Sequence, residues 1–222
     1  MRIMKVVDLS VVVGAGTQVY PGDPEPRLTP HSTIERDGFN LLSVAMGSQT
    51  GTHVDAPYHF DEATERIDEV PLERFVGRGV IVDATGVGPR GVITWAHVEP
   101  VADSIDPGCI VLLHTGWSLH YGTDAYFENP YLDAAACREL LARGVRTFGI
   151  DAINIDETPD PEHPGIGFPV HHLIAEAGGI ICENLTNLAA IDFAEPQISL
   201  LPISLEAADG APVRAVAIQF GE

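Results

Sequence analysis

The sequence predicts an α/β fold built on a mixed central sheet. Short apolar segments typical of buried strands outnumber the helical segments, and the two types alternate in the second half of the chain. The 22 glycines and 17 prolines are spread along the chain, so no linker is visible. With 222 residues, 45% of them hydrophobic, the chain can bury a substantial core, and we expect one domain over residues 1–222.

The first half is predicted to be mainly extended. Val6–Val13 has the apolar pattern of a strand. Residues 20–26 should form an irregular loop, because three prolines and a glycine interrupt both sheet ladders and helices. Leu41–Met46 and the following Gly47–Asp55 are expected to be extended, and Gly79–Asp83 is expected to be a short buried strand.

The second half alternates predicted helices and strands. Helices are expected where a capping residue or proline precedes an amphipathic run: Trp95–Ala102 after Thr94, Ala134–Ala142 between Asp133 and Gly144, and Pro169–Ala177 before Gly178. Strands are expected over the intervening apolar runs, at Cys109–His114, Thr147–Ile150, Ile180–Cys182 and Ala211–Gln219.

Charge and cysteine content restrict the partners and the compartment. The net charge of −20 would repel a nucleic-acid backbone or an anionic membrane, so we expect neither as a partner. No apolar stretch reaches the roughly 18–20 residues that span a bilayer, and no signal peptide is visible. The three cysteines, Cys109, Cys137 and Cys182, are too widely spaced for a disulfide framework, so we expect buried free thiols and a cytoplasmic protein.

Residues 49–59 contain the strongest candidate for a chemical site. Because side chains alternate faces in an extended chain, one face would carry the odd-numbered members: Gln49, Gly51, His53 and Asp55. That face offers an amide oxygen, a gap, an imidazole and a carboxylate, which suit zinc, manganese or iron(II). His59 follows a chain turn, where it can face the same cleft without being a ligand.

A histidine and an aspartate two residues apart are a weak signal alone, since many strands contain such a pair without any site. Two further features favour a site. A Gly-Thr pair precedes the motif and an Ala-Pro-x-His segment follows it, and acidic groups and histidines recur downstream at His171, His172 and Glu183.

Other polar residues have two open interpretations. Asp151 and Asp156 follow a strand and are either partners that orient a ligand histidine or structural turn residues. His114, at a strand end, is either a site residue or a partly exposed histidine. Arg214 either meets a substrate carboxylate or forms a salt bridge with one of the many acids.

Residues 49–60, Gln-Thr-Gly-Thr-His-Val-Asp-Ala-Pro-Tyr-His-Phe, resemble the signature of the cyclase-like metal-dependent hydrolase family, of the kynurenine formamidase and isatin hydrolase type. The family pattern is His-x-Gly-Thr-His-x-Asp-x-Pro-x-His. The resemblance extends over nearly the whole chain, in order and spacing, through residues 20–24, 113–117, 149–156, 171, 183–188 and 209–215.

The resemblance implies a swivelling β/β/α arrangement, assembled as a homodimer or homotetramer, with one or two divalent zinc or manganese ions per subunit. Carried over residue by residue, it implies His59 as general base and acid. The metal ligands that it implies are Gln49, His53, Asp55, His171 and Glu183. His171 is preferred to its neighbour His172 because its spacing to Glu183 fits the family pattern.

Gln49 departs from the family pattern, which has histidine at this position. A glutamine oxygen is a weaker ligand than imidazole for borderline metals. Three outcomes are therefore open: Gln49 binds the metal through its oxygen and favours a harder ion such as manganese, it bonds to a metal-bound water, or one metal subsite is lost.

The implied function is hydrolysis of a small cyclic or aryl amide, formamide or lactone. Metal-bound water would attack the carbonyl, and His59 would transfer the proton. One alternative is a cyclase or dehydratase that acts on a polyketide-like or other secondary-metabolite substrate. The other is a non-catalytic descendant that binds a small molecule.

Overall fold

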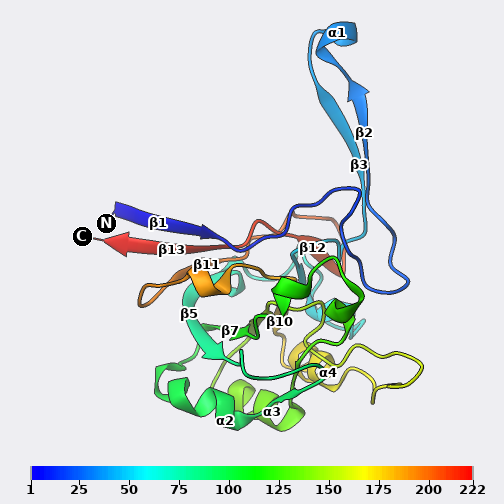
Figure 1. Cartoon of the computed structure of the whole chain (residues 1–222). Coiled ribbons are helices and arrows are strands. Elements are labelled where there is room, and N and C mark those ends of the chain that lie inside the picture. Colours follow the sequence, from blue (N-terminus) through cyan, green and yellow to red (C-terminus); the bar gives the residue numbers. More distant parts are fainter. Residues whose placement is uncertain (1, 222) are drawn as a thin grey trace.

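The computed structural model describes residues 2–221, and a nine-stranded sheet runs through it (Figure 1). Four parallel strands form its centre: β5 (Val76–Asp83), β7 (Ile110–His114), β9 (Thr147–Ile150) and β10 (Ile180–Glu183). Antiparallel strands extend it beyond β5, in the order β11 (Gln197–Ser199), β13 (Val216–Gly221) and β1 (Arg2–Asp8). Beyond β10 the antiparallel strands are β4 (His53–Asp55) and β12 (Gly210–Pro212). The mixed α/β class expected from the sequence is therefore confirmed.

The sheet separates two apolar cores, because side chains alternate along each strand. On β7, Val111 and Leu113 enter one core, whereas Ile110 and Leu112 enter the other. The first core is covered by the helices α2 (Trp95–Val98), α3 (Ala134–Ala142) and α4 (Pro169–Glu176), which lie on one side of the sheet in Figure 1. The second core is closed by loops and by the outer strands.

The sheet also curls back on itself. β12 stands at one end of the strand order and β13 lies next to the other end, yet only residues 213–215 join them. Four Cα steps span at most about 15 Å, so the two ends of the sheet must approach each other. A backbone hydrogen bond from Leu9 to Ala215 (2.9 Å) and an isolated bridge between Ser10 and Leu185 close this gap.

The helices α2 and α3 begin directly after the capping residues predicted from the sequence, Thr94 and Asp133. The Asp133 side chain accepts a hydrogen bond from the backbone of Ala136 at the start of α3, as expected of a helix cap. α2 is shorter than expected, because Pro100 lacks the amide hydrogen that an α-helix needs, and the chain continues as a 3-10 helix over Glu99–Ser104. Further 3-10 helices occupy Pro57–His59, Leu72–Arg74, Trp117–His120, Asp124–Phe127 and Leu188–Ala190.

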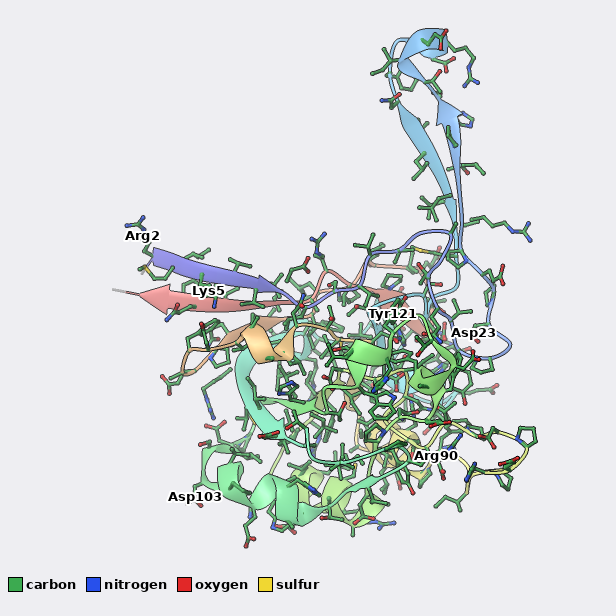
Figure 2. All side chains as sticks on the ribbon, in the orientation of Figure 1. Arg2, Lys5, Asp23, Arg90, Asp103 and Tyr121 are labelled. Atoms are coloured by element: carbon green, nitrogen blue, oxygen red, sulfur yellow. The ribbon has the colours of Figure 1, made fainter. Side chains whose placement is uncertain are left out.

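A two-stranded hairpin projects from the body of the protein (Figure 1). It contains β2 (Arg27–Ser32), the one-turn helix α1 (Ile34–Asp37) and β3 (Leu41–Ala45), and we call residues 27–45 the arm. Every residue of β3 is exposed. Figure 2 shows the arm's side chains with no other element beside them. A second small sheet pairs β6 (Val92–Ile93) with β8 (Tyr131–Leu132).

Three expected strands differ from the structure. β1 ends at Asp8, so the prediction over Val6–Val13 placed the first strand too late. The closing strand is divided into β12 and β13, because the two belong to opposite ends of the curled sheet. Residues 48–52 form a turn, in which Gly51 adopts a left-handed conformation with φ +67°. Of the segment Gly47–Asp55, which was expected to be extended, only β4 is a strand. Within residues 2–221, no helix is long and apolar enough to cross a membrane.

Candidate metal centre

β4 and β10 place an imidazole and two carboxylates side by side. Glu183 lies opposite His53 in the antiparallel pairing of the two strands. Val54 enters the second core, so His53 and Asp55, its neighbours in β4, point to the opposite face, toward α4. His53, Asp55 and Glu183 are all buried, and one ligand atom of each lies within 4.8 Å of the others.

The first turn of α4 adds His171 to this group. The Asp156 carboxylate accepts hydrogen bonds from the backbone amides of Val170 and His171, both at 3.0 Å, and from His171 Nδ1 at 2.8 Å. The ring is therefore fixed with Nε2 toward the centre, 3.6 Å from Asp55 Oδ2 and 3.4 Å from Glu183 Oε1.

His53 is held in an equivalent way. Its Nδ1 donates to the backbone oxygen of Gly51 at 2.8 Å, because a carbonyl can only accept. Its Nε2 lies 3.4 Å from Asp55 Oδ1 and 3.8 Å from Glu183 Oε2. Both histidines thus use Nδ1 for a structural bond and present Nε2 to the centre, an orientation typical of ligand histidines.

The crowding of these groups shifts their protonation. Burial lowers the pKa of His53, but Asp55 and Glu183 outweigh burial and raise it to about 9. Burial also lowers the pKa of His171, whereas hydrogen bonds to neighbouring carboxylates, Asp156 first among them, raise it well above its usual value. Burial raises the pKa of Asp55, but the hydrogen bonds with His171 and His53 lower it by a larger amount, so the net shift is downward. The buried carboxylates therefore require positive charge beside them.

A divalent cation fits this donor set. Asp55 Oδ1 is buried and has no hydrogen-bond partner among residues 2–221, and such an oxygen is costly to leave unpaired. His53 Nε2 and His171 Nε2 each lie within 4 Å of both carboxylates, and imidazole nitrogens and carboxylates are the ligands that zinc and manganese take in proteins. Asp55 lies between both histidines, where its two oxygens face different imidazoles.

Gln49 and His59 lie beside this cluster and share one partner, Asp209. Gln49 Nε2 donates to Asp209 Oδ2 at 2.8 Å, and His59 Nδ1 lies 3.0 Å from the same oxygen. Ser48 Oγ donates to Asp209 Oδ1 at 2.8 Å. Burial lowers the pKa of His59, but the hydrogen bond to Asp209 outweighs it and raises the pKa.

A cavity of about 260 Å³ opens over the cluster and contains all six of the residues selected from the sequence. Its full lining is Tyr20, Asp23, Gln49, His53, Asp55, His59, Phe60, Ile153, Asn154, Phe168, His171, Glu183 and Asn184. Aromatic rings form one wall, with the centroids of Phe60 and Phe168 5.4 Å apart. Asp23, labelled in Figure 2, comes from the loop at residues 20–26.

Several residues with two open interpretations now have a defined place. Asp156 orients His171, whereas Asp151 accepts hydrogen bonds from the backbone amides of Thr115 and Gly116 and supports a turn. Arg214 pairs with Asp8 at 2.6 Å and lies outside the cavity lining.

Sequence reasoning missed three contributors to the site. Phe60 and Phe168 line the cavity, but single aromatic residues give no signal that separates a cavity wall from a core. Asp209 was recognised only as part of a matching segment, and its contact with Gln49 depends on pairing between residues 160 positions apart.

Comparison with known proteins extends the similarity beyond the motif. The family model named Cyclase matches residues 7–157. A kynurenine formamidase of Paracidovorax citrulli is 31% identical over 227 residues, which cover 94% of each chain. A solved structure described as a potential metal-dependent hydrolase with cyclase activity is 28% identical, with a TM-score of 0.77 and coverage of 98% of this chain and 99% of its own. Isatin hydrolase A from Labrenzia aggregata, solved with benzyl benzoate, is 24% identical and shows the same fold, with a TM-score of 0.86 and coverage of 96% and 93%.

Proposed function

The chain belongs to the Cyclase family, whose model matches residues 7–157, and from this membership we propose that it is a metal-dependent hydrolase of carbon–nitrogen bonds outside peptides. Its substrate is a small cyclic or aryl amide, formamide or lactone, and residues 1–222 act as one domain. The observation that carries the proposal is the convergence of two buried histidines and two buried carboxylates under one cavity.

The protein would hold one or two zinc or manganese ions through His53, Asp55, His171 and Glu183, with Gln49 as a further oxygen ligand. Supporting evidence is the unpartnered Asp55 Oδ1 and the orientation of both Nε2 atoms toward the centre. A bound divalent ion polarises a carbonyl and makes water acidic enough to act as a nucleophile near neutral pH.

His59 would move the proton. Its Nδ1 is engaged by Asp209, so Nε2 is the ring atom that can accept a proton from the attacking water and return it to the leaving nitrogen. The side chain lies in the cavity lining and keeps contact with solvent, being 31% exposed, which lets it exchange protons between turnovers.

The cavity wall supports an aryl substrate. Phe60 packs against both Phe168 and His171, with ring centroids 5.4 and 4.4 Å away, so an aromatic cluster lines the cavity beside the metal ligands. An aromatic ring packed there would place its substituent over the cluster.

We further propose that the chain is cytoplasmic and forms a homodimer or homotetramer, with neither nucleic acid nor membrane as a partner. Three buried free cysteines suit a reducing compartment. The net charge of −20 disfavours binding to polyanions. The arm supports self-association, because Leu42 and Val44, which are 49% and 50% exposed, lie on one face of its hairpin.

The test is metal content per subunit, by elemental analysis of protein purified without a metal-chelating tag. We expect about one or two zinc or manganese ions in the native chain and none in His53→Ala. A panel of formyl-anilides, lactams and lactones would then be screened, with His59→Ala keeping its metal and losing at least about 100-fold in kcat. A native chain that takes up neither metal would contradict the proposal.

A further inference from the structure

The amide of Gln49 has a defined orientation. The amide oxygen and nitrogen of glutamine have nearly the same shape, but their chemistry distinguishes them here, because the neighbouring Asp209 carboxylate offers only acceptor atoms. The nitrogen must therefore face Asp209, at 2.8 Å from Oδ2. Oε1 then faces away from Asp209, and it is buried without a hydrogen-bond partner among residues 2–221.

The same carboxylate oxygen decides the tautomer of His59. A carboxylate accepts, so the proton lies on Nδ1, 3.0 Å from Asp209 Oδ2, and the neutral ring keeps its lone pair on Nε2. An isolated neutral histidine carries its proton mainly on Nε2, and an isolated glutamine amide has no fixed orientation. Asp209 thus determines that Gln49 presents its oxygen, and His59 its Nε2, to the cavity.

The backbone is shaped to receive this contact. A side chain at Gly210 would put its Cβ 2.7 Å from Gln49 Nε2 and 2.6 Å from the backbone oxygen of Val54. The glycine that follows Asp209 therefore leaves room for the glutamine amide beside β4. Ser48 Oγ occupies the other carboxylate oxygen, so Asp209 has no freedom to rotate away.

We propose that Asp209 is a positioning residue that makes Gln49 present its oxygen, and His59 its Nε2, to the metal centre. The inference deepens the proposed function and rests on it for the metal. An imidazole at this position could donate a hydrogen bond to Asp209 through one nitrogen and bind the cation through the other. Glutamine offers the same pair of functions, because its NH₂ group donates to Asp209 and its oxygen can bind a cation. Without Asp209 the amide is free to rotate and to direct its NH₂ group, which repels a cation, into the cavity that Gln49 lines.

The first experiment reads the orientation without metal or activity. Long-range ¹H–¹⁵N spectra of the metal-free chain at pH 9 report the His59 tautomer, and side-chain amide exchange reports Gln49. We expect a proton on Nδ1 and a slowly exchanging Gln49 amide in the native chain. In Asp209→Ala we expect the proton on Nε2 and a rapidly exchanging amide.

Asp209→Asn is the matched conservative variant. Its amide oxygen can accept from both Gln49 and His59, while its NH₂ donates to Ser48 Oγ, which can also accept. We expect this variant to retain both native signals. If Asp209→Ala fails to fold, Asp209→Asn and Ser48→Ala, which leaves Oδ2 with both donors, still test the assignment: both should keep the native tautomer, and loss of it in either variant overturns the inference.

The second experiment measures zinc and manganese affinity by calorimetry in a double-mutant cycle. Loss of an orienting partner typically weakens metal binding about 10–100-fold, so we expect that loss in Asp209→Ala. In the Gln49→Ala background the same change should cost less than about 3-fold, because the residue through which Asp209 acts is gone.

The outcomes separate the two claims. An equal loss of affinity in both backgrounds, or a native chain with free Gln49 amide and a proton on His59 Nε2, overturns the positioning role of Asp209. A native chain that shows both orientation signals but binds neither metal supports the orientation of Gln49 and His59 by Asp209 and contradicts the proposed function.

Discussion

His171 and His172 are adjacent in the chain, but the structure gives them opposite environments. His171 is buried, with a side-chain exposure of 5%, and Asp156 holds its ring toward two carboxylates. His172 is exposed on the outer side of α4 and contacts the edge of Phe60. Consecutive residues of a helix point about 100° apart, so only one of them can face the cluster.

This contrast yields a matched pair of variants. His171→Ala should lower zinc or manganese affinity by at least about 100-fold, because it removes a ligand and leaves Asp55 and Glu183 buried beside each other. His172→Ala, an equal change in composition at an exposed position, should stay within about 3-fold of the native affinity. Calorimetric titration of both proteins measures this, and equal losses would contradict the placement of His171.

The residues of the site were easier to predict than their partners. His53 and Asp55 belong to a contiguous motif with period-two spacing, which sequence alone makes visible. The choice of His171 over His172 used the spacing to Glu183 in the family pattern. The contact of Asp209 with Gln49 and His59 was not predictable, because it follows from strand pairing between distant segments and leaves no local pattern.

Among the elements, the turn at residues 48–52 positions the side chains of Gln49 and His53. Gly51 has φ +67°, and its backbone oxygen accepts the hydrogen bond from His53 Nδ1. A Cβ at this position would lie 2.8 Å from Val13 Cγ2. Gln49 therefore reaches the cavity lining from a turn, and not from the extended segment that the sequence predicted.

Gly51→Ala should therefore lower the free energy of unfolding by about 1–3 kcal/mol, since alanine is strained at positive φ and meets Val13. Gly14→Ala is the control, because its Cβ would meet no atom within 4 Å. That control should change stability by less than about 0.5 kcal/mol. Urea unfolding of both variants provides the comparison, and equal stabilities would mean that the turn tolerates a side chain.

The arm provides a second prediction at this scale. Leu42 and Val44 share one face of the hairpin with their cross-strand partners Pro30 and Leu28, whereas Ser43 points to the other face. If that apolar face covers a second copy of the chain, Leu42→Asp should shift the protein toward monomer and Ser43→Asp should not. Light scattering after size-exclusion chromatography measures the mass, and an unchanged assembly in Leu42→Asp would remove the arm from the interface.

Strands with strong apolar runs were predicted within a few residues, and short strands were not. β9 occupies the predicted residues, because Thr147–Ile150 is apolar and bounded by turns. β11 and β12, of three residues each, carry no such run: β11 pairs with the longer strands β13 and β5, and β12 pairs with β4, which also has three residues. Tertiary pairing, rather than local preference, creates them.

At the scale of the whole molecule, each face of the sheet has its own core, and each core contains at least one buried thiol. Cys137 lies in the core under the helices, and Cys182 in the core on the opposite face. Burial raises the pKa of Cys137 to about 12, so at pH 8 only about one in ten thousand of these groups is the reactive thiolate even where reagent can reach it.

The two thiols therefore report whether the cores unfold together. We expect no reaction with an aromatic disulfide reagent in the native chain at pH 8, and reaction of all three cysteines after denaturation. In single-cysteine variants under mild urea, Cys137 and Cys182 should become reactive with the same midpoint, because β7 and β10 supply side chains to both cores. Distinct midpoints would mean that one face opens independently.

The pairing of β4 also has a consequence for how the protein is made. His53 lies opposite Glu183 on one side and Pro212 on the other, and β4 has no other neighbours. A ribosome adds about 5–20 residues per second, so roughly six to twenty-five seconds pass between the synthesis of β4 and that of Glu183, the last of the proposed ligands. The growing chain has no complete ligand set during that interval. The proposed site can therefore take up a metal ion only after Glu183 has been synthesised, from the ions available where folding finishes.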